Sequence, residues 1–131
     1  MSDGSLILIV DDEEYFREIF STKLGAEGFS VETAESGEEG IKKAKKLKPN
    51  LILMDVKMPG MDGVATVMKM KEDPETKDLK VVFLTSFGSP EEELQAIDVK
   101  YSKDIGAAGY IRKTDDLDIL VSKIRAFTDP S

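Results

Sequence analysis

Near the start of the chain stands Leu6-Ile-Leu-Ile-Val10-Asp11-Asp12, a run of apolar residues followed directly by two carboxylates. A run this short, with no polar position inside it, is typical of a buried β-strand. A strand that is apolar at every position has both faces covered, as in a parallel sheet between two layers of helices. The stretch therefore predicts a central strand whose carboxyl end carries two acidic residues.

Four more short runs follow, separated by longer stretches of helical periodicity, and this alternation predicts five βα units around a parallel sheet. The runs are Val31–Ala34, Leu51–Met54, Val81–Leu84 and Gly109–Arg112. The runs that begin at residues 6, 51 and 81 are apolar throughout, whereas those at 31 and 109 are mixed and are expected at the edges. With right-handed crossovers, the pattern predicts an α/β, flavodoxin-like (βα)5 doubly wound parallel sheet, with strand order 2-1-3-4-5, in a single domain.

The stretches between the runs each show one apolar stripe, as expected of helices that pack on a sheet. The stripes are Phe16, Ile19, Phe20 and Leu24 in the first helix, Ile41, Ala44 and Leu47 in the second, and Leu117, Leu120, Val121, Ile124 and Phe127 in the fifth. Ser36-Gly-Glu-Glu39 and Ser89-Pro-Glu-Glu92 predict capping boxes that open the second and fourth helices. Gly25 and Gly28 are expected to end the first helix.

Composition excludes several classes of function. The 131 residues carry a net charge of −8, which argues against direct binding of a nucleic acid, since such surfaces neutralise phosphates with Lys and Arg. The chain has no Cys and no His, so it offers no disulfide, no thiolate and no phosphohistidine of its own. The apolar run at residues 6–10 is too short for a signal peptide or for membrane insertion. We therefore expect one cytoplasmic domain over residues 1–131, with its core at about 6–127.

Polar side chains follow directly after four of the predicted strands. In open α/β sheets ligands bind at the carboxyl ends of the strands, so these side chains are expected to converge on one pocket. They are Asp11, Asp12, Asp55, Thr85, Ser86 and Lys113. Each alone has an ordinary explanation: Asp11 or Asp12 can cap a helix, Asp55 can hold a loop, and the others can lie at strand ends or on the surface. Their joint occurrence is what indicates a site.

The chemistry of such a pocket points to a hard cation and a phosphoryl group. Three carboxylates within a few ångströms repel one another, and a divalent cation relieves the repulsion. Mg²⁺ takes oxygen ligands and commonly shares one or two carboxylates with a phosphate. An aspartate can form an aspartyl-phosphate where a metal and a lysine neutralise the phosphoryl oxygens. Asp55 is the candidate nucleophile, because it ends the central strand between the acidic pair and Lys113.

Four motifs together resemble the receiver domain of two-component response regulators. They are Ile9-Val-Asp-Asp-Glu13, Leu51-Ile-Leu-Met-Asp55-Val-Lys-Met-Pro-Gly-Met-Asp-Gly63, Leu84-Thr-Ser86 and Gly106-Ala-Ala-Gly-Tyr-Ile-Arg-Lys113. The resemblance implies that Asp55 accepts a phosphoryl group from a phosphohistidine on a sensor histidine kinase or a histidine phosphotransfer protein. It also implies that Asp11 and Asp12 provide or position ligands for Mg²⁺, and that Lys57 contributes its backbone carbonyl.

The same resemblance assigns roles beyond the acceptor. It implies that Lys113 pairs with the phosphoryl group, that the Thr85 hydroxyl is the switch hydrogen-bond donor, and that the Tyr110 ring follows Thr85. A downstream effector protein would then bind the switched face. Such a chain is a phospho-accepting signalling protein that catalyses only its own phosphorylation and dephosphorylation.

Three features depart from the family pattern. Thr114 follows Lys113 where the family usually has proline, and a cis peptide there would cost about 2.5 to 4 kcal/mol. The stretch between Thr85 and Lys113 is longer than usual, and its apolar stripe predicts that the extra length extends the fourth helix. That stripe is Leu94, Ile97, Tyr101 and Ile105. Lys57 places a positive side chain next to Asp55, where it either contacts the site or is simply solvated while its carbonyl serves the metal.

Two other functions fit parts of the pattern. A Mg²⁺-dependent phosphatase of the haloacid-dehalogenase type also builds an aspartyl-phosphate, but it needs a second carboxylate two residues after the nucleophile, where this chain has Lys57. A pseudo-receiver would keep the fold and bind partners without phosphorylation, yet here every expected acidic, hydroxyl and lysine position is filled. Binding of FMN or a dinucleotide is disfavoured, because no Gly-rich phosphate loop follows the first strand.

Overall fold

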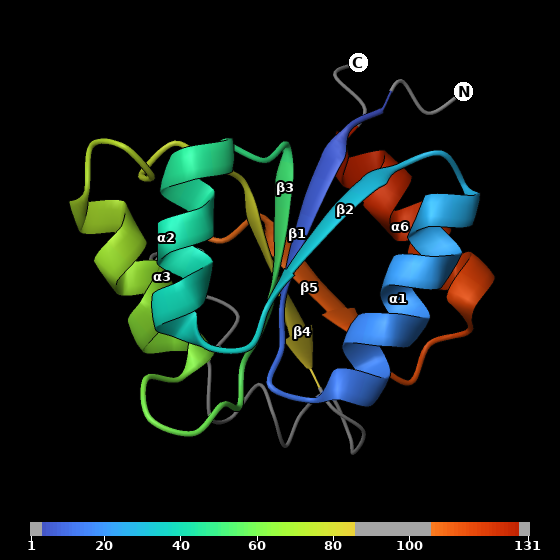
Figure 1. Ribbon diagram of the computed structural model, residues 1–131, viewed down its shortest axis with the longest axis horizontal. Helices are drawn as coiled ribbons and strands as arrows, with labels where there is room; N and C mark the ends of the chain where they lie inside the picture. Colours follow the sequence, from blue (N-terminus) through green and yellow to red (C-terminus); the bar gives the residue numbers. More distant parts are fainter. Residues whose placement is uncertain (1–3, 86–105, 129–131) are drawn as a thin grey trace.

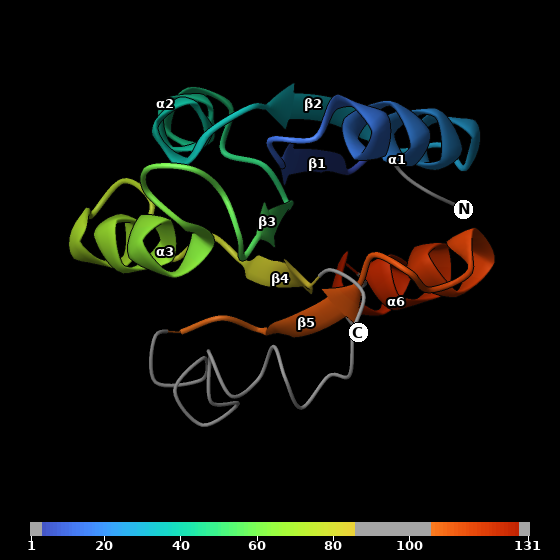
Figure 2. The ribbon, with the colours of Figure 1, turned by 90° about the horizontal axis from the view of Figure 1, so that it is seen from below.

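Five parallel strands form one sheet in the order β2-β1-β3-β4-β5 in the computed structural model, which describes residues 4–85 and 106–128. The strands are β1 Leu6–Val10, β2 Ser30–Ala34, β3 Leu51–Asp55, β4 Val81–Thr85 and β5 Gly109–Arg112. The predicted flavodoxin-like sheet and its strand order are confirmed, as Figure 2 shows. Both β3 and β4 are one residue longer than predicted, so that Asp55 and Thr85 are the last residues of their strands.

Helices cover both faces of this sheet, as the apolar central strands require. The described part of the chain contains four of them, α1 Glu14–Ala26, α2 Gly37–Leu47, α3 Gly63–Glu72 and α6 Leu117–Thr128. The α2 and α3 helices lie on one face, and α1 and α6 lie on the other (Figure 1). The predicted fourth helix, with its capping box at Ser89 and its stripe from Leu94 to Ile105, lies outside the described residues.

The core consists of two apolar layers separated by the sheet. Alternate residues of β1 point to opposite faces: Leu8 and Val10 pack toward α2 and α3, whereas Ile7 and Ile9 pack toward α1 and α6. The strands β1, β3 and β4 are almost wholly buried, and β2 and β5 keep partly exposed residues at the edges. The edge positions inferred from the mixed runs are therefore correct.

Local signals place the helix ends. The Ser36 hydroxyl accepts a hydrogen bond of 3.2 Å from the backbone N–H of Glu39, as the predicted cap of α2 requires. At the end of α1, Gly25 is still helical, and it is Gly28 that takes the left-handed conformation, with φ +96°. The described residues contain no cis peptide, so the bond between Lys113 and Thr114 is trans.

Candidate functional site

The carboxyl edge of the sheet gathers four carboxylates. Asp11 and Asp12 follow β1, Asp55 ends β3, and one oxygen of each lies within 4.8 Å of the others and of a Glu13 oxygen. Asp11 and Asp55 are buried, whereas Asp12 and Glu13 are exposed. The structure thus brings together the three aspartates expected from the sequence and adds one acidic residue to them.

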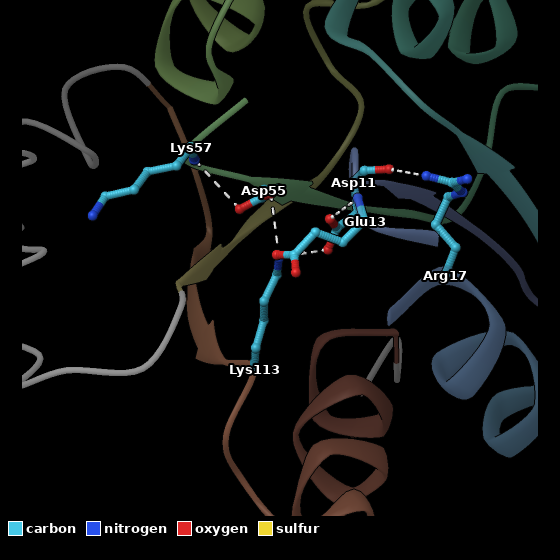
Figure 3. Close-up of polar contacts among 6 residues, drawn as sticks. All are labelled: Asp11, Glu13, Arg17, Asp55, Lys57 and Lys113. Atoms are coloured by element: carbon cyan, nitrogen blue, oxygen red, sulfur yellow. Dashed lines mark hydrogen bonds and ion pairs between the residues drawn. The ribbon is translucent and has the colours of Figure 1, made fainter. Parts of the chain in front are cut away.

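The ammonium group of Lys113 lies among these carboxylates. Its Nζ is 2.7 Å from Asp11 Oδ2, 3.2 Å from Asp55 Oδ2 and 3.2 Å from Glu13 Oε1 (Figure 3). The Lys113 side chain is 1% exposed, and its Nζ lies 4.6 Å from the centre of the Phe16 ring, which packs a cation over an aromatic face. One buried cation therefore holds three acidic side chains from two distant parts of the chain.

Asp11 is anchored by four separate contacts. Its N–H donates to the Ala34 carbonyl at 3.0 Å, which extends the pairing of β1 with β2. Its carbonyl accepts from Arg17 Nη1 at 2.8 Å, and its Oδ1 accepts from the Glu13 N–H at 2.9 Å. Its Oδ2 is left facing Lys113. Because the N-cap of α1 is Glu13, Asp11 holds the turn before the helix rather than capping it.

The loop after Asp55 is held by its own backbone and by α3. Asp55 Oδ1 accepts from the Lys57 N–H at 3.3 Å, and the Gly63 N–H donates to the Val56 carbonyl at 3.0 Å. A Cβ at Gly63 would lie 2.1 Å from the Asp55 carbonyl oxygen, so only glycine lets the start of α3 approach the strand end this closely. The Asp62 carboxylate caps α3 by accepting from the Ala65 N–H at 2.8 Å.

The pocket changes the acidity of its buried groups. Burial, and after it the negative charge of Asp11, raises the pKa of Asp55 to about 7, although Lys113 acts in the opposite direction. Burial alone would lower the pKa of Lys113, but its close contact with Asp11 at 2.7 Å and the charges of Asp55 and Asp11 outweigh burial and raise it. The pocket therefore favours the charged form of Lys113 and disfavours the ionised form of Asp55.

The remaining predicted residues lie around this pocket in different ways. Thr85 is buried at the end of β4, and its carbonyl accepts from the Lys113 N–H at 2.8 Å. The Lys57 side chain is exposed and points away from Asp55 and Lys113 in Figure 3. Tyr110, on β5, is 40% exposed. Ser86 lies outside the described residues.

Sequence reasoning missed three contributors to the site. The motifs assign no role to Glu13, the apolar pattern places Phe16 in the stripe of the first helix, and nothing in the sequence points to Arg17. The available signal was position, because all three lie within five residues of Asp12. Their targets were not visible, since the Lys113 ammonium that Glu13 and Phe16 contact is about a hundred residues away along the chain.

The donor set suits a hard divalent cation. All four acidic side chains offer oxygen, and Asp11 Oδ2 is buried and accepts no hydrogen bond of good geometry, although it pairs with Lys113. Carboxylate oxygens crowded in this way repel one another and match the preference of Mg²⁺ for oxygen ligands. The residues present therefore fit the metal expected from the sequence.

Comparison with known proteins decides the family. The family model described as the response regulator receiver domain matches residues 7–125. The chain belongs to this family. The match covers β1 from its second residue, the other four strands completely and the residues of the acidic pocket, so the resemblance seen in the four motifs extends across the sheet.

Relatives of this receiver domain include proteins of similar length and proteins that are much longer. The response regulator PleD of Caulobacter vibrioides is 34% identical over 122 residues, which are 93% of this chain but 26% of the relative. Sporulation initiation phosphotransferase F of Bacillus subtilis is 31% identical over 121 residues, 92% of this chain and 91% of the relative. The chemotaxis protein CheY4 of Vibrio cholerae is a structural neighbour, with a TM-score of 0.81, 30% identity and coverage of 94% and 98%.

The chain spans between a quarter and about half of the length of several curated relatives that it matches. Among the described residues, no helix is both long enough and apolar enough to cross a membrane.

Proposed function

We propose that this receiver domain accepts a phosphoryl group on Asp55, with Mg²⁺, from the phosphohistidine of a sensor histidine kinase or a histidine phosphotransfer protein. The observation that carries the proposal is the position of Asp55, buried at the end of β3 between the Asp11–Asp12 pair and Lys113. The domain, with its core at about residues 6–127, then passes the signal to a downstream effector protein. Neither direct nucleic-acid binding nor membrane insertion is part of this function.

Each residue has a defined part in the transfer. An Asp55 carboxylate oxygen forms a bond to phosphorus as the N–P bond of the donor histidine breaks, and the imidazole leaves with that electron pair and takes a proton from solvent. Lys113 neutralises charge on the phosphoryl oxygens. Asp11, Asp12, Asp55 and the Lys57 carbonyl would hold Mg²⁺, which when bound supplies positive charge that favours ionised Asp55 and offsets the phosphoryl charge.

Incubation with acetyl phosphate tests this function directly. In the presence of Mg²⁺, the mass of the intact protein should rise by one phosphoryl group, and chelation of the metal should prevent the increase. A mass that stays unchanged under conditions in which the protein is folded would favour the pseudo-receiver. The phosphatase alternative receives no support, because Lys57 stands where its acid would be and points its side chain away from Asp55.

Mg²⁺ should stabilise the folded domain, because the ligands come together only in the native state. At about 10 mM Mg²⁺ we expect a gain of about 1 to 2 kcal/mol, or roughly 4 to 8 °C in melting temperature. Asp12→Ala should remove most of this gain, since Asp12 is the exposed member of the aspartate cluster and can turn to the metal. Glu14→Ala, which removes an acidic residue outside the cluster, should keep it. Thermal unfolding with and without Mg²⁺ measures the effect; equal gains in both variants would contradict the site.

Thr85 should couple the pocket to β5. Its carbonyl accepts a hydrogen bond from the Lys113 N–H, and it is the last residue of β4, next to the strand end that carries Asp55. A phosphoryl group on Asp55 would add acceptor oxygens for the Thr85 hydroxyl. On addition of beryllofluoride, a phosphoryl mimic, the amide resonances of Asp55, Lys113 and Tyr110 should shift. Thr85→Ala should reduce the response at Tyr110 and leave that at Asp55, whereas Thr33→Ala on β2 should change neither. An undiminished Tyr110 response in Thr85→Ala would rule out this coupling.

A further inference from the structure

We propose that Glu13 is a displaceable counter-ion of Lys113, a positioning residue that holds the ammonium in the unphosphorylated state and opposes the arrival of the phosphoryl group. The inference deepens the proposed function and rests on it. It begins from the three carboxylates that lie within 3.2 Å of Lys113 Nζ, of which Glu13 accepts a hydrogen bond of good geometry. A phosphoryl oxygen that approaches Lys113 therefore competes with the Glu13 carboxylate for the ammonium group.

Burial distinguishes the three partners. The Asp11 and Asp55 side chains are 0% and 3% exposed, whereas the Glu13 side chain is 52% exposed. A buried carboxylate that loses its cation keeps an uncompensated charge, and that is costly. A half-exposed carboxylate regains water as it leaves. Glu13 is therefore the partner that Lys113 can release most easily.

The backbone of Glu13 does not need its side chain. Its N–H donates to Asp11 Oδ1 at 2.9 Å and its carbonyl accepts from the Arg17 N–H at 3.1 Å, so the residue is fixed at the N-cap of α1. The side chain makes no capping hydrogen bond, although the N-cap position offers that role. It reaches across to Lys113 instead (Figure 3). The side chain can thus turn into solvent without moving the helix or the acidic loop.

Charge sets the direction of the effect. A phosphoryl group on Asp55 brings negative charge close to the Glu13 carboxylate, because one oxygen of Asp55 and one of Glu13 lie within 4.8 Å of each other, and like charges this close repel. Glu13 therefore competes for Lys113 and also repels the incoming group. Glu13→Gln keeps the size of the side chain and removes its charge, so it should favour the phosphoryl-bound state.

Beryllofluoride affinity tests the inference. Calorimetric titration in saturating Mg²⁺ should show that Glu13→Gln binds beryllofluoride about two- to fivefold more tightly than the wild type, the range expected for a half-exposed ion pair. The matched control is Glu14→Gln, which removes the same charge one residue further on, on a side chain outside the acidic cluster. That variant should stay within about 1.5-fold of the wild type. The Mg²⁺ affinity of each variant is measured separately, so that every titration with beryllofluoride is carried out at a Mg²⁺ concentration that saturates that variant.

Each other result has a definite meaning. Equal or weaker binding of beryllofluoride by Glu13→Gln, in a wild type that binds it, overturns this inference and leaves the proposed function standing. An equal gain in Glu14→Gln also overturns it, because the effect would then be general charge rather than the contact with Lys113. A wild type that binds no beryllofluoride in Mg²⁺ overturns the proposed function, and this inference with it.

Discussion

Asp55→Asn should abolish phosphoryl uptake from acetyl phosphate while making the metal-free protein more stable. The loss is expected to be complete, because asparagine lacks the carboxylate oxygen that forms the bond to phosphorus. Intact mass after incubation with acetyl phosphate and Mg²⁺ measures it. An unchanged increase in mass would show that another residue is the acceptor.

The gain in stability follows from the pKa of Asp55. Burial and the charge of Asp11 raise it from 3.8 to about 7, so the folded state holds a proton that the unfolded state releases between these values. The unfavourable contribution of Asp55 is therefore absent at low pH, grows as pH rises from about 4, and is full above pH 7. At pH 8 without metal, Asp55→Asn should add about 2 to 4 kcal/mol, roughly 7 to 15 °C in melting temperature.

The pH dependence of that gain is the decisive measurement. Thermal unfolding of wild type and Asp55→Asn in a chelator should give curves that converge near pH 4 and separate as pH rises. Asp62→Asn is the matched control, because it makes the same replacement in the same loop and an asparagine still caps α3. A gain that is constant across this pH range, or one that the control shares, would contradict the electrostatic origin.

Lys113→Met should strongly destabilise the metal-free protein near neutral pH. It leaves Asp11, Asp55 and Glu13 without the cation that holds them, and the loss of one partner from a buried pair typically costs about 3 to 5 kcal/mol. The destabilisation should be smaller near pH 5, below the raised pKa of Asp55, where this carboxyl group is largely protonated and leaves less unpaired charge. Mg²⁺ should recover part of it, because a second source of positive charge replaces the first.

A double variant keeps this prediction testable if Lys113→Met alone is too unstable to study. Lys113→Met combined with Asp55→Asn removes one of the buried charges left unpaired, so its free energy of unfolding should exceed that of Lys113→Met at pH 8. Lys123→Met is the control. Its Nζ makes an ion pair with Asp115 at 2.8 Å, but its side chain is 44% exposed and Asp115 keeps an ion pair with Arg112 at 3.6 Å, so the variant should cost less than about 1 kcal/mol. Equal losses of unfolding free energy in Lys113→Met and Lys123→Met would mean that the Lys113 ammonium stabilises the fold no more than a surface ion pair does.

The primary structure alone was enough to predict the sheet and the convergence of the acidic pocket. Apolar runs of strand length determine which segments are covered on both faces, and the mixed runs at 31–34 and 109–112 correctly marked the edges. The parallel arrangement then sends every strand end to one edge, so Asp11, Asp55 and Lys113 had to meet there. These features are local patterns combined with a topological rule, and neither requires knowledge of a side chain's direction.

Only the tertiary structure decided how the pocket is held and charged. The contact of Glu13 with Lys113, the bond from Arg17 to the Asp11 carbonyl and the outward direction of Lys57 each depend on a side-chain rotamer and on neighbours brought near by folding. The raised pKa of Asp55 depends on burial, which the packing of every surrounding element sets. Burial and the interaction between charges act over distances of a few ångströms, and they join residues that can be a hundred positions apart in the chain. The sequence pattern therefore predicts neither the burial of a side chain nor the charges that surround it.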